Sequence, residues 1–432
     1  MTTYESNYWL TTVSMRAASA GELPARVDVA VIGAGFTGLS AARVLAKRGA
    51  KVAVLEAKTI GWGASSRNGG MVLTGLKLSA EALSNKYGVE LTRRMYAASV
   101  SSIDLVEQIV RDENIDCNFS RSGYLEVACK QSHFDEYARS RDFIAKEMNH
   151  ERRIVPRNEL ASEIGSTIYY GGMLDETSAG VNPARYVGGL AGAARRAGAS
   201  IYENAGVLNI QRGSQNGAGG FEIKTARGNV HARDVLVATS GYTSSATPAL
   251  KKKVIPIGSF IIVTERLPES LARELSPRNR MISDSKHYLH YYRLTPDNRM
   301  LFGGRAAFFP ETKNTVRRSA EILRGDMVRV FPQLKNTKIE HAWGGTLDFC
   351  FDTMPHCGQM DGLYYALGYA GHGVAMATYC GAKMAEKISG SGGEEIPFAA
   401  IPFPGAPLGL YNGRPWFLPF AGAYYKVLDW IS

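Results

Sequence analysis

The sequence predicts an α/β protein, α+β overall, in which a discontinuous Rossmann-type nucleotide-binding domain is combined with a domain built on an antiparallel sheet. Three observations lead to this expectation. A strand–helix–strand pattern with a glycine-rich turn lies near the start, similar turns return far along the chain, and the residues from Ile255 onward alternate like antiparallel strands. With 432 residues, the chain is long enough for two domains.

The first strand is expected at Val27 to Ile32, an apolar run typical of a buried parallel strand. Gly33, Gly35 and Gly38 follow with GxGxxG spacing, and Thr37 to Arg48 is predicted to be a helix. The free N–H groups and the positive dipole end of such a helix favour a pyrophosphate.

Lys51 to Glu56 is the second predicted strand, and Glu56 ends it about where an acid binds a ribose diol. An acid at this point argues against a 2′-phosphate. The motif does not by itself separate FAD from NAD.

Composition limits the partners and the compartment. The net charge of +10 comes from scattered residues, apart from Lys251 to Lys253, so nucleic acid is not an expected partner. The five cysteines are odd in number and form no CxxC pair, which favours a reducing compartment and offers neither a metal site nor a disulfide framework. Without a signal-peptide or membrane-spanning pattern, the expected location is the cytoplasm.

Further elements are predicted from periodicity and from turn residues. Helices are expected at Leu83–Asn114, Pro183–Gly198 and Thr315–Phe331, and strands at Gly123–Ala128, Ser200–Arg212, Phe221–Ala226, Asp234–Ala238 and the segments IPIGSFIIVTE, KHYLHYYRLT and RMLFGGRA. Residues 27–95, 180–245 and 340–390 are assigned to the nucleotide-binding domain, 96–179 and 246–339 to a substrate domain, and 391–432 to a C-terminal tail.

The tail contains PWFLPFAGAYYKVLDWI, which either contacts a membrane surface peripherally or, as we favour, covers an apolar groove of the protein or of a subunit partner. The oligomeric state stays open.

Four glycine-bearing turns, GAGFTG, GASSRNGG, ATSGYT and GYAGHG, lie far apart in the sequence. A long ligand with separate adenine, pyrophosphate and second-ring positions explains several such turns, and extended FAD is such a ligand. GYAGHG opens a predicted helix from Val374 to Ile388, so its N–H groups can stabilise negative charge on a reduced flavin.

The quoted motifs, together with RLTPDNRMLFGGRA and WGGTLDFCFDTMPH, resemble the D-amino-acid-oxidase-like flavoprotein superfamily from about Tyr8 to Trp430. Within it, the sequence is most similar to γ-glutamylputrescine oxidases. The resemblance implies the cofactor contacts Gly33, Gly35, Gly38, Glu56, Ser65, Arg67, Asn68, Gly69, Val207, Gly241, Gly371, His372, Gly373 and Val374. It also implies that Tyr291 and Arg293 form a roof over the flavin.

Two departures from the family pattern are informative. Leu347 stands where amino-acid oxidases of the superfamily commonly place an arginine that clamps the α-carboxylate. Gly344 or Gly345 stands where sarcosine-oxidase relatives tether the flavin through cysteine, so FAD is expected to bind non-covalently, although Cys350 is close in sequence. An α-amino-acid substrate is therefore disfavoured.

The implied reaction oxidises a CH–NH bond of an amine to an imine, which water hydrolyses to an aldehyde, while O2 is reduced to H2O2. The candidate catalytic residues are His372, Tyr291, Arg293 and Tyr369, and no metal is expected. For His372 a structural contact with the flavin is favoured over proton abstraction, and Arg293 either binds a distal carboxylate or pairs with a structural acid. Tyr291, Phe349 and Tyr369 are expected to disfavour a buried ammonium.

Other functions stay open at this stage. One is a dehydrogenase of the same fold that passes electrons to a membrane quinone, and another is a non-catalytic flavin sensor. Putrescine conjugates, N-methylated amino acids and secondary amines all remain candidate substrates.

Overall fold

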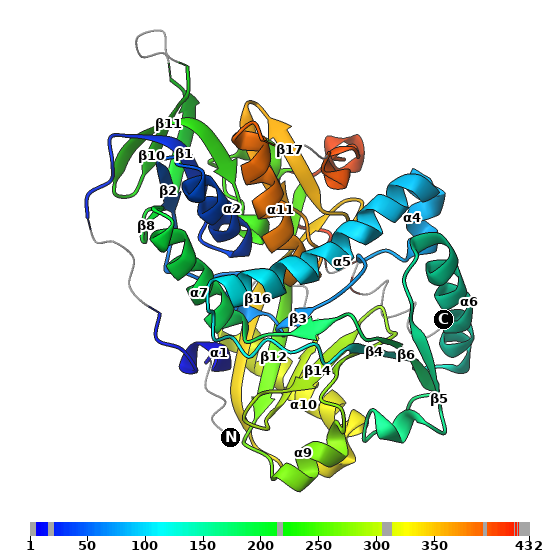
Figure 1. Cartoon of the computed structure of the whole chain (residues 1–432). Coiled ribbons are helices and arrows are strands. Elements are labelled where there is room, and N and C mark those ends of the chain that lie inside the picture. Colours follow the sequence, from blue (N-terminus) through cyan, green and yellow to red (C-terminus); the bar gives the residue numbers. More distant parts are fainter. Residues whose placement is uncertain are drawn as a thin grey trace.

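The computed structural model describes residues 6–15, 21–213, 219–304, 313–391, 395–418, 420 and 422. Two eight-stranded sheets and a two-stranded sheet form its framework. In Figure 1 the first large sheet occupies the upper part of the molecule and the second the lower part, and helix α5 (Val89–Asp112) runs between them. The α/β fold with a nucleotide-binding sheet and a second sheet is confirmed.

The first sheet has a parallel centre. Its strand order is β17 (His356–Met360), β18 (Leu363–Leu367), β11 (Gly228–Val237), β1 (Arg26–Ile32), β2 (Val52–Leu55) and β8 (Ser200–Tyr202), with β10 (Phe221–Thr225) on β11 and β9 (Val207–Arg212) on β10. The contacts β8–β2, β2–β1, β1–β11 and β11–β18 are parallel. Since every residue of β2 is buried, this part of the sheet is covered on both faces.

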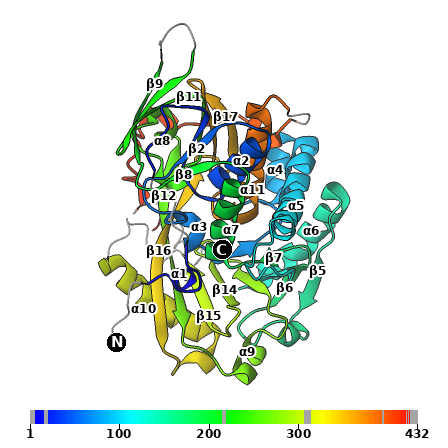
Figure 2. The same cartoon turned by 60° about the vertical axis from the view of Figure 1, so that its left-hand side comes forward.

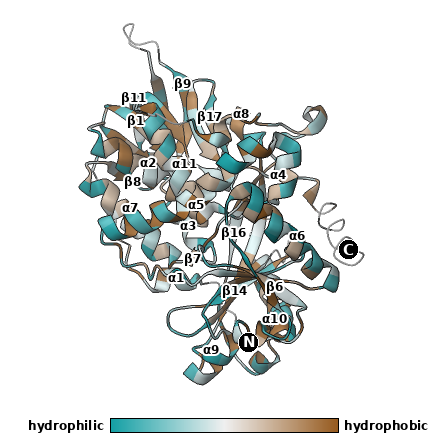
Figure 3. Cartoon of the chain, turned by 45° about the vertical axis from the view of Figure 1, so that its right-hand side comes forward, coloured by the Kyte–Doolittle hydropathy of each residue, from teal (hydrophilic) through white to brown (hydrophobic). Residues whose placement is uncertain are grey.

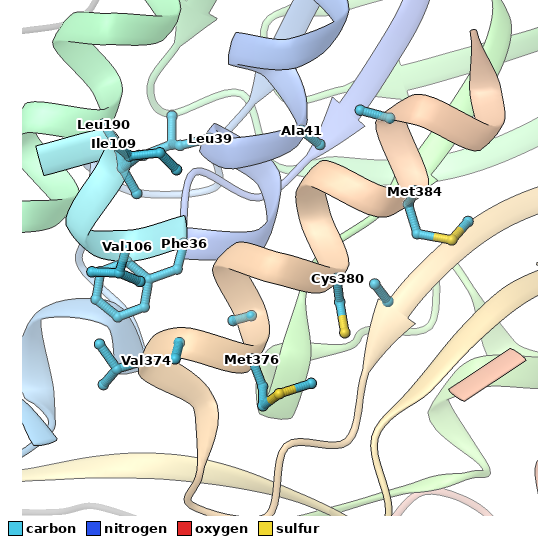
Figure 4. Packing of buried hydrophobic residues seen from close by; sticks show 14 of the residues in the cluster. Phe36, Leu39, Ala41, Val106, Ile109, Leu190, Val374, Met376, Cys380 and Met384 are labelled. Carbon is cyan, nitrogen blue, oxygen red and sulfur yellow. The ribbon is translucent and has the colours of Figure 1, made fainter. Parts of the chain in front are cut away.

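Three helices, α2 (Phe36–Lys47), α7 (Pro183–Arg196) and α11 (Gly373–Ile388), pack against this sheet, and α5 packs on α11. Figure 4 shows side chains of all four meeting in one apolar cluster, in which Phe36 and Leu39 of α2 lie near Val106 and Ile109 of α5 and Val374 and Met376 of α11. This cluster fixes the N-termini of α2 and α11 relative to each other.

The second sheet is antiparallel except at one junction. Its order is β16 (Ile339–Cys350), β12 (Val254–Thr264), β15 (Met300–Gly304), β14 (His290–Leu294), β13 (Met281–Asp284), β4 (Tyr124–Val127), β6 (Gly171–Asp175) and β5 (Arg153–Pro156), with β13 and β4 parallel. Helix α10 (Lys313–Val330) packs against β12, β15 and β16, and Figure 2 shows it beside these strands.

The remaining elements are short or peripheral. They are the strands β3 (Met71–Val72) and β7 (Ala179–Gly180), the helices α1 (Tyr8–Thr11), α3 (Ala64–Arg67), α4 (Ala80–Tyr87), α6 (Gln131–Met148), α8 (Pro248–Lys251) and α9 (Glu269–Leu275), and 3-10 turns at Leu160–Ser162, Ser240–Tyr242, Pro332–Leu334, Pro397–Ala399 and Pro407–Gly409. Figure 3 shows hydrophilic residues on the outward side of α6, whereas apolar residues gather on the strands. Within the described ranges, no helix is both long and apolar enough to span a membrane.

Most predicted elements are found within one or two residues of their expected ends, and the differences have local causes. The helix expected at Leu83–Asn114 divides at Gly88, whose φ of 84° interrupts helical geometry. The strand expected at Ser200–Arg212 is two strands, because Asn204 adopts a left-handed φ of 55° between them. Helix α6 was not predicted, since its buried face consists of only Tyr137, Ile144 and Met148.

The predicted segment 340–390 divides between the two sheets. Its beginning lies in β16, which is hydrogen-bonded along its length to β12, whereas β17, β18 and α11 belong to the first sheet and its helices. Residues 305–312, which include the last two residues of the motif RMLFGGRA, and residues 423–432 of the aromatic tail lie outside the described residues. The domain boundaries themselves stay a prediction.

The contact between α2 and α11 yields the first testable prediction. A Cβ atom on Gly381 of α11 would lie 2.2 Å from the carbonyl oxygen of Thr37, a backbone atom that cannot turn away. Gly381→Ala should therefore lower the free energy of unfolding by about 1–3 kcal/mol, the usual cost of overpacking. Thermal and urea unfolding measure the change.

Gly325→Ala is the matched control, because this helical glycine of α10 has no described atom within 4 Å of the new methyl group. It should leave stability unchanged or raise it by up to ~1 kcal/mol, because alanine favours the helix more than glycine does. Equal effects of the two substitutions would show that the α2–α11 contact does not limit stability.

Candidate active site

An elongated cavity of about 390 Å³ begins at the carboxyl ends of the central strands of the first sheet. Residues from all four glycine-rich motifs line it. Those that the sequence predicted as cofactor contacts are Gly33, Gly35, Glu56, Ser65, Asn68, Val207, Gly371, Gly373 and Val374. The ends of parallel strands at a topological switch point are the usual site for nucleotides in such sheets.

The turn after β1 depends on two glycines. Gly33 has a φ of +104°, in the region that side chains rarely occupy. No side chain fits at Gly38 for a different reason, because a Cβ there would lie 2.0 Å from the carbonyl oxygen of Gly33. The first turn of α2 can therefore lie directly on the strand end, with its N-terminus toward the cavity.

Glu56 supports this turn from the end of β2. Its carboxylate accepts hydrogen bonds from the backbone N–H groups of Ala34 and Lys58, both at 2.8 Å. Burial raises the pKa of Glu56, while these N–H donors oppose that rise. Glu56 thus shapes the glycine turn as well as lining the cavity.

The second motif, GASSRNGG, is held by hydrogen bonds from the first motif, from the N-terminal segment and from β16. The Ser65 hydroxyl accepts a hydrogen bond from the N–H of Phe36 at 3.0 Å. The indole N–H of Trp9 donates to the carbonyl of Asn68 at 2.9 Å, and that of Trp343 donates to the carbonyl of Arg67 at 3.1 Å. Segments distant in sequence therefore fix this loop in one conformation.

The far end of the cavity is formed by the last motif. Helix α11 begins at Gly373 with His372 as its N-cap, one residue before the predicted start at Val374. Tyr369, a predicted catalytic residue, lines this first cavity, and its hydroxyl lies 2.7 Å from the Thr37 hydroxyl. Because that contact joins α2 to the turn before α11, we now propose a positioning role for Tyr369.

A second cavity of about 150 Å³ adjoins the first. Residues that line both are Ala64, Asn68, Leu347, Gly371 and Val374. Strands of the second sheet supply Ser259, Ser283, Tyr291 and Phe349 to the second cavity, and the predicted contacts Arg67, Gly69 and His372 lie here as well. The second cavity therefore lies between the nucleotide-type site and the antiparallel sheet.

Tyr291 forms part of the wall that the second sheet gives to this cavity. Its ring packs on Gly303, where a Cβ would lie 2.3 Å from the ring, and it approaches Gly69 from the facing loop. Burial raises the pKa of Tyr291 to about 12, so its hydroxyl is protonated at neutral pH. Tyr291 thus offers the cavity an aromatic face and a neutral hydroxyl.

His372 is neutral in this environment. Burial, and next the positive charge of Lys77, lower its pKa to about 3. Its Nδ1 atom is buried and has no hydrogen-bond partner among the described residues. A buried polar atom without a partner beside a cavity is ready to pair with a ligand.

Arg293 does not have the predicted position. It is buried outside both cavities, and its Nη1 donates at 3.1 Å to the carbonyls of Gly70 and Val181, while its Nε donates to the carbonyl of Leu294. Its partners in these contacts are backbone carbonyls and not a structural acid. We therefore propose that Arg293 anchors the loop after the second motif.

Two other predicted cofactor contacts, Gly241 and Gly38, line neither cavity and lie where a side chain would not fit. Gly241 lies against β16, where a Cβ would be 2.9 Å from the carbonyl oxygen of Leu347. Gly38 lies beneath the first turn, as described above. Cys350, which left covalent attachment open, is buried and lines neither cavity.

The sequence reasoning missed three residues with charge near the site, namely Lys58 and Asp348 at the first cavity and Lys77 at the second. Asp348 lines the first cavity, accepts a hydrogen bond from the N–H of Gly368 at 2.7 Å, and has a pKa raised to about 6 by burial. Lys77 lines the second cavity from the loop after β3. The alternation of polar and apolar residues in β16 was the only signal for Asp348, and Lys77 lies in a loop without periodicity.

The geometry fits FAD. The first cavity is long, its glycine turn admits a backbone approach that a side chain would block, and the N-termini of α2 and α11 both border it. Gly33, Gly35 and Ser65 would hold the pyrophosphate, Glu56 and Val207 the adenosine, and Gly371 to Val374 the flavin ring. An elongated nucleotide site joined to a smaller second cavity defines a flavin-dependent oxidoreductase.

Comparison with known proteins agrees with this class. Residues 28–387 match the family described as DAO: FAD dependent oxidoreductase. The chain is 33% identical to gamma-glutamylputrescine oxidoreductase of Escherichia coli over 410 residues, covering 93% of this chain and 92% of the relative. It is also 33% identical to probable oxidoreductase OrdL of Haemophilus influenzae over 411 residues, with the same coverage.

Among solved structures, the fold is similar to that of glycine oxidase from Geobacillus kaustophilus, with a TM-score of 0.73, 21% identity, and coverage of 89% of this chain and 99% of the other. The protein belongs to the DAO family of FAD-dependent oxidoreductases. The predicted cofactor and enzyme class are thereby confirmed.

Glu56→Gln tests the support of the first turn. An amide has one acceptor oxygen, so either the Ala34 or the Lys58 N–H loses its partner, at a cost of about 1–3 kcal/mol. We expect FAD to bind about 10- to 100-fold more weakly, as measured by flavin fluorescence titration of the apoprotein. Glu151→Gln, at an exposed residue outside both cavities, should bind FAD normally.

The lowered pKa of His372 predicts an acid-sensitive contribution to stability. Above pH 6.5 the histidine is neutral in both states, so it imposes no cost. As pH falls from 6.5 toward 3, His372 binds a proton in the unfolded chain but stays neutral in the folded protein. The free energy of unfolding therefore decreases. At pH 5 this loss amounts to up to about 2 kcal/mol.

His372→Asn should therefore lose less stability than the wild type between pH 7.5 and pH 5. Thermal unfolding of the FAD-loaded proteins at both pH values gives the comparison. An identical acid dependence in the two proteins would mean that the His372 pKa is not lowered.

Proposed function

We propose that this protein oxidises the CH–NH bond of an amine of the γ-glutamylputrescine type to an imine, which water hydrolyses to an aldehyde. The observation that carries the proposal is the small second cavity, formed between an antiparallel sheet and the last glycine turn, which joins the FAD-type cavity directly. Support also comes from the 33% identity to gamma-glutamylputrescine oxidoreductase over nearly the whole chain.

The FAD supplies a two-electron acceptor when bound, and we propose that O2 is the final oxidant, giving H2O2. The residues of the chain prepare the substrate. Phe349, Leu347 and Leu289 exclude water from the second cavity, and the positive charges of Arg67 and Lys77 disfavour an ammonium beside them. The amine is therefore held in its neutral form, which is the form that can be oxidised.

Among the described residues, no carboxylate lines the second cavity. His372 has its pKa near 3 and Tyr291 has its pKa near 12, so the first is a weak acceptor and the second a hydrogen-bond donor at neutral pH. We propose that the His372 imidazole and the Tyr291 hydroxyl orient the amine or the flavin and that neither removes a carbon-bound proton. The substrate amine then gives its proton to bulk water as it enters the cavity.

A membrane quinone is the alternative electron acceptor, and one observation favours it. Leu408, Leu410, Trp416 and Phe420 are 92%, 67%, 62% and 72% exposed, which makes a cluster of apolar side chains suited to a membrane interface. The same segment also packs inward, because Tyr411 and Leu418 belong to a buried cluster with Phe349. Covering the protein's own groove, the role favoured from the sequence, therefore accounts for part of the tail.

The proposed function is tested by an anaerobic panel of amines and amino acids. The purified protein should be yellow, and a γ-glutamyl diamine should bleach the flavin absorbance while α-amino acids do not. The rate of bleaching should rise between pH 6 and pH 9, because the substrate must be deprotonated. A protein whose flavin no amine reduces is a sensor and not the proposed enzyme.

Oxygen and quinone are separated in the same preparation. Stoichiometric H2O2 from full-length protein without another acceptor supports the oxidase, whereas reoxidation only on adding quinone and vesicles supports the dehydrogenase. Replacing Leu408, Leu410, Trp416 and Phe420 with serine removes the exposed apolar side chains but leaves Tyr411 and Leu418 in place. These replacements should abolish vesicle-dependent turnover if the quinone route operates. A soluble cytoplasmic oxidase should not be affected.

A further inference from the structure

Residues 403–420, of which all but residue 419 are described, form a tail segment with a buried side and an exposed side. On the buried side, Tyr411 and Leu418 pack in a cluster with Ile255 of β12. The Tyr411 hydroxyl also donates to the carbonyl of Val254 at 2.8 Å. These contacts attach the tail segment to the second sheet.

The exposed side of the tail segment is apolar. Four of the ten exposed large apolar side chains of the described residues lie between residues 408 and 420, and they are the four most exposed of the ten. They are Leu408, Leu410, Trp416 and Phe420. Single exposed apolar residues are common on protein surfaces, but a group of them in one short segment marks an interaction surface.

Three consecutive lysines lie beside the tail segment. Lys251 ends α8, and Lys252 and Lys253 connect it to β12. The aliphatic chain of Lys251 packs at Gly413, where a Cβ would lie 2.8 Å from the Lys251 Cγ. The Lys253 Nζ donates to the carbonyl of Phe403. The lysines are therefore joined to both the beginning and the middle of the tail segment.

The two segments carry positive charge and no acidic residue. Arg414 follows Gly413 directly and is exposed, as is Lys252. Residues 238–264 and 397–422 contain neither Asp nor Glu. The cations Lys251, Lys252 and Arg414 and the four exposed apolar side chains together make up what we call the tail surface.

The combination of charges and apolar groups indicates the kind of partner. Anionic lipid headgroups attract each nearby Lys or Arg, while leucine and aromatic side chains enter the boundary between headgroups and acyl chains. The long stems of lysine and arginine let their charges reach lipid phosphates while apolar neighbours lie deeper. A second copy of this chain fits less well, because a two-fold symmetric contact would bring the same cations together.

The tail surface adjoins the walls of both cavities. Ala246 and Thr247, which directly precede α8, line the first cavity. Phe349, which belongs to the same buried cluster as Tyr411 and Leu418, lines the second. A protein attached through the tail surface would therefore hold its reaction site close to its partner.

We propose that the tail surface binds the surface of an anionic membrane. Leu408, Leu410, Trp416 and Phe420 enter the interface, and the cations Lys251, Lys252 and Arg414 pair with lipid phosphates. This binding does not depend on the proposed amine oxidation, and it is compatible with either O2 or a quinone as the electron acceptor.

The experiment measures binding of the full-length, FAD-loaded protein to lipid vesicles by cosedimentation, without substrate. Vesicles of phosphatidylcholine alone are compared with vesicles that contain about 30% phosphatidylglycerol. We expect an affinity at least about tenfold higher for the anionic vesicles, because each cation near the surface contributes. Raising NaCl from about 0.05 M to about 0.5 M should remove most of this difference, since salt screens the attraction.

Two double variants separate the charged and apolar contributions. Lys252→Glu with Arg414→Glu should bind anionic vesicles at least about tenfold more weakly and leave binding to phosphatidylcholine unchanged. Leu408→Ser with Trp416→Ser should weaken binding to both kinds of vesicle. None of the four residues lines a cavity, so both variants should keep the flavin absorbance of the wild type.

Arg278→Glu with Lys335→Glu is the matched control. It changes the net charge by the same amount at exposed residues after α9 and after the Pro332–Leu334 turn, so it should bind anionic vesicles like the wild type. Equal weakening by this control would assign the binding to net charge and overturn the proposal.

Two other results would also overturn it. One is the absence of any preference for anionic vesicles at low salt. The other is a dimer of the wild type in analytical ultracentrifugation that Leu408→Ser with Trp416→Ser dissociates, since the tail surface would then be an interface between copies of this chain. Neither result bears on whether an amine reduces the flavin, so the proposed function is decided separately.

Discussion

The close approach of three backbones at α2 fixes the geometry of this protein. On one side, Gly38 lets the helix lie on the carbonyl of Gly33 at the end of β1, and on the other, Gly381 lets α11 lie on the carbonyl of Thr37. Both contacts leave no room for a methyl group. As a result, two helix N-termini, one from residue 36 and one from residue 373, border the same elongated cavity. Their partial positive charges then act together on one ligand.

The second sheet contributes to the site through its side chains, whereas the first contributes through close backbone contacts. Long strands such as β12 and β16 carry aromatic and apolar residues to the boundary with the first cavity. Burial there keeps tyrosines protonated and a histidine neutral. Charged groups beside this second cavity therefore act through surroundings of low polarity, where each charge has a large effect.

The sequence was sufficient for the parts of the site that depend on backbone geometry. The spacing of Gly33, Gly35 and Gly38 and the position of Glu56 are local signals. Gly33, Gly35 and Glu56 line the cavity, and Gly38 lies beneath the turn. Side-chain direction was harder to predict. Arg293 shares a strand with Tyr291, yet its guanidinium turns to the carbonyls of Gly70 and Val181, which are distant in sequence. Lys77 escaped notice because a loop lysine has no periodic pattern, and only the fold brings it to the cavity.

The N-terminal segment has a consequence for how the chain is made. Tyr8 and Trp9 are buried in a cluster with Ile261, Leu301 and Trp343, so these aromatic residues leave the ribosome long before the surfaces that cover them exist. Until synthesis passes Trp343, this cluster is incomplete, and the carbonyl of Arg67 lacks the second indole that holds its loop. A nascent chain stalled before that point would leave part of an apolar cluster uncovered, which is the kind of surface that chaperones bind.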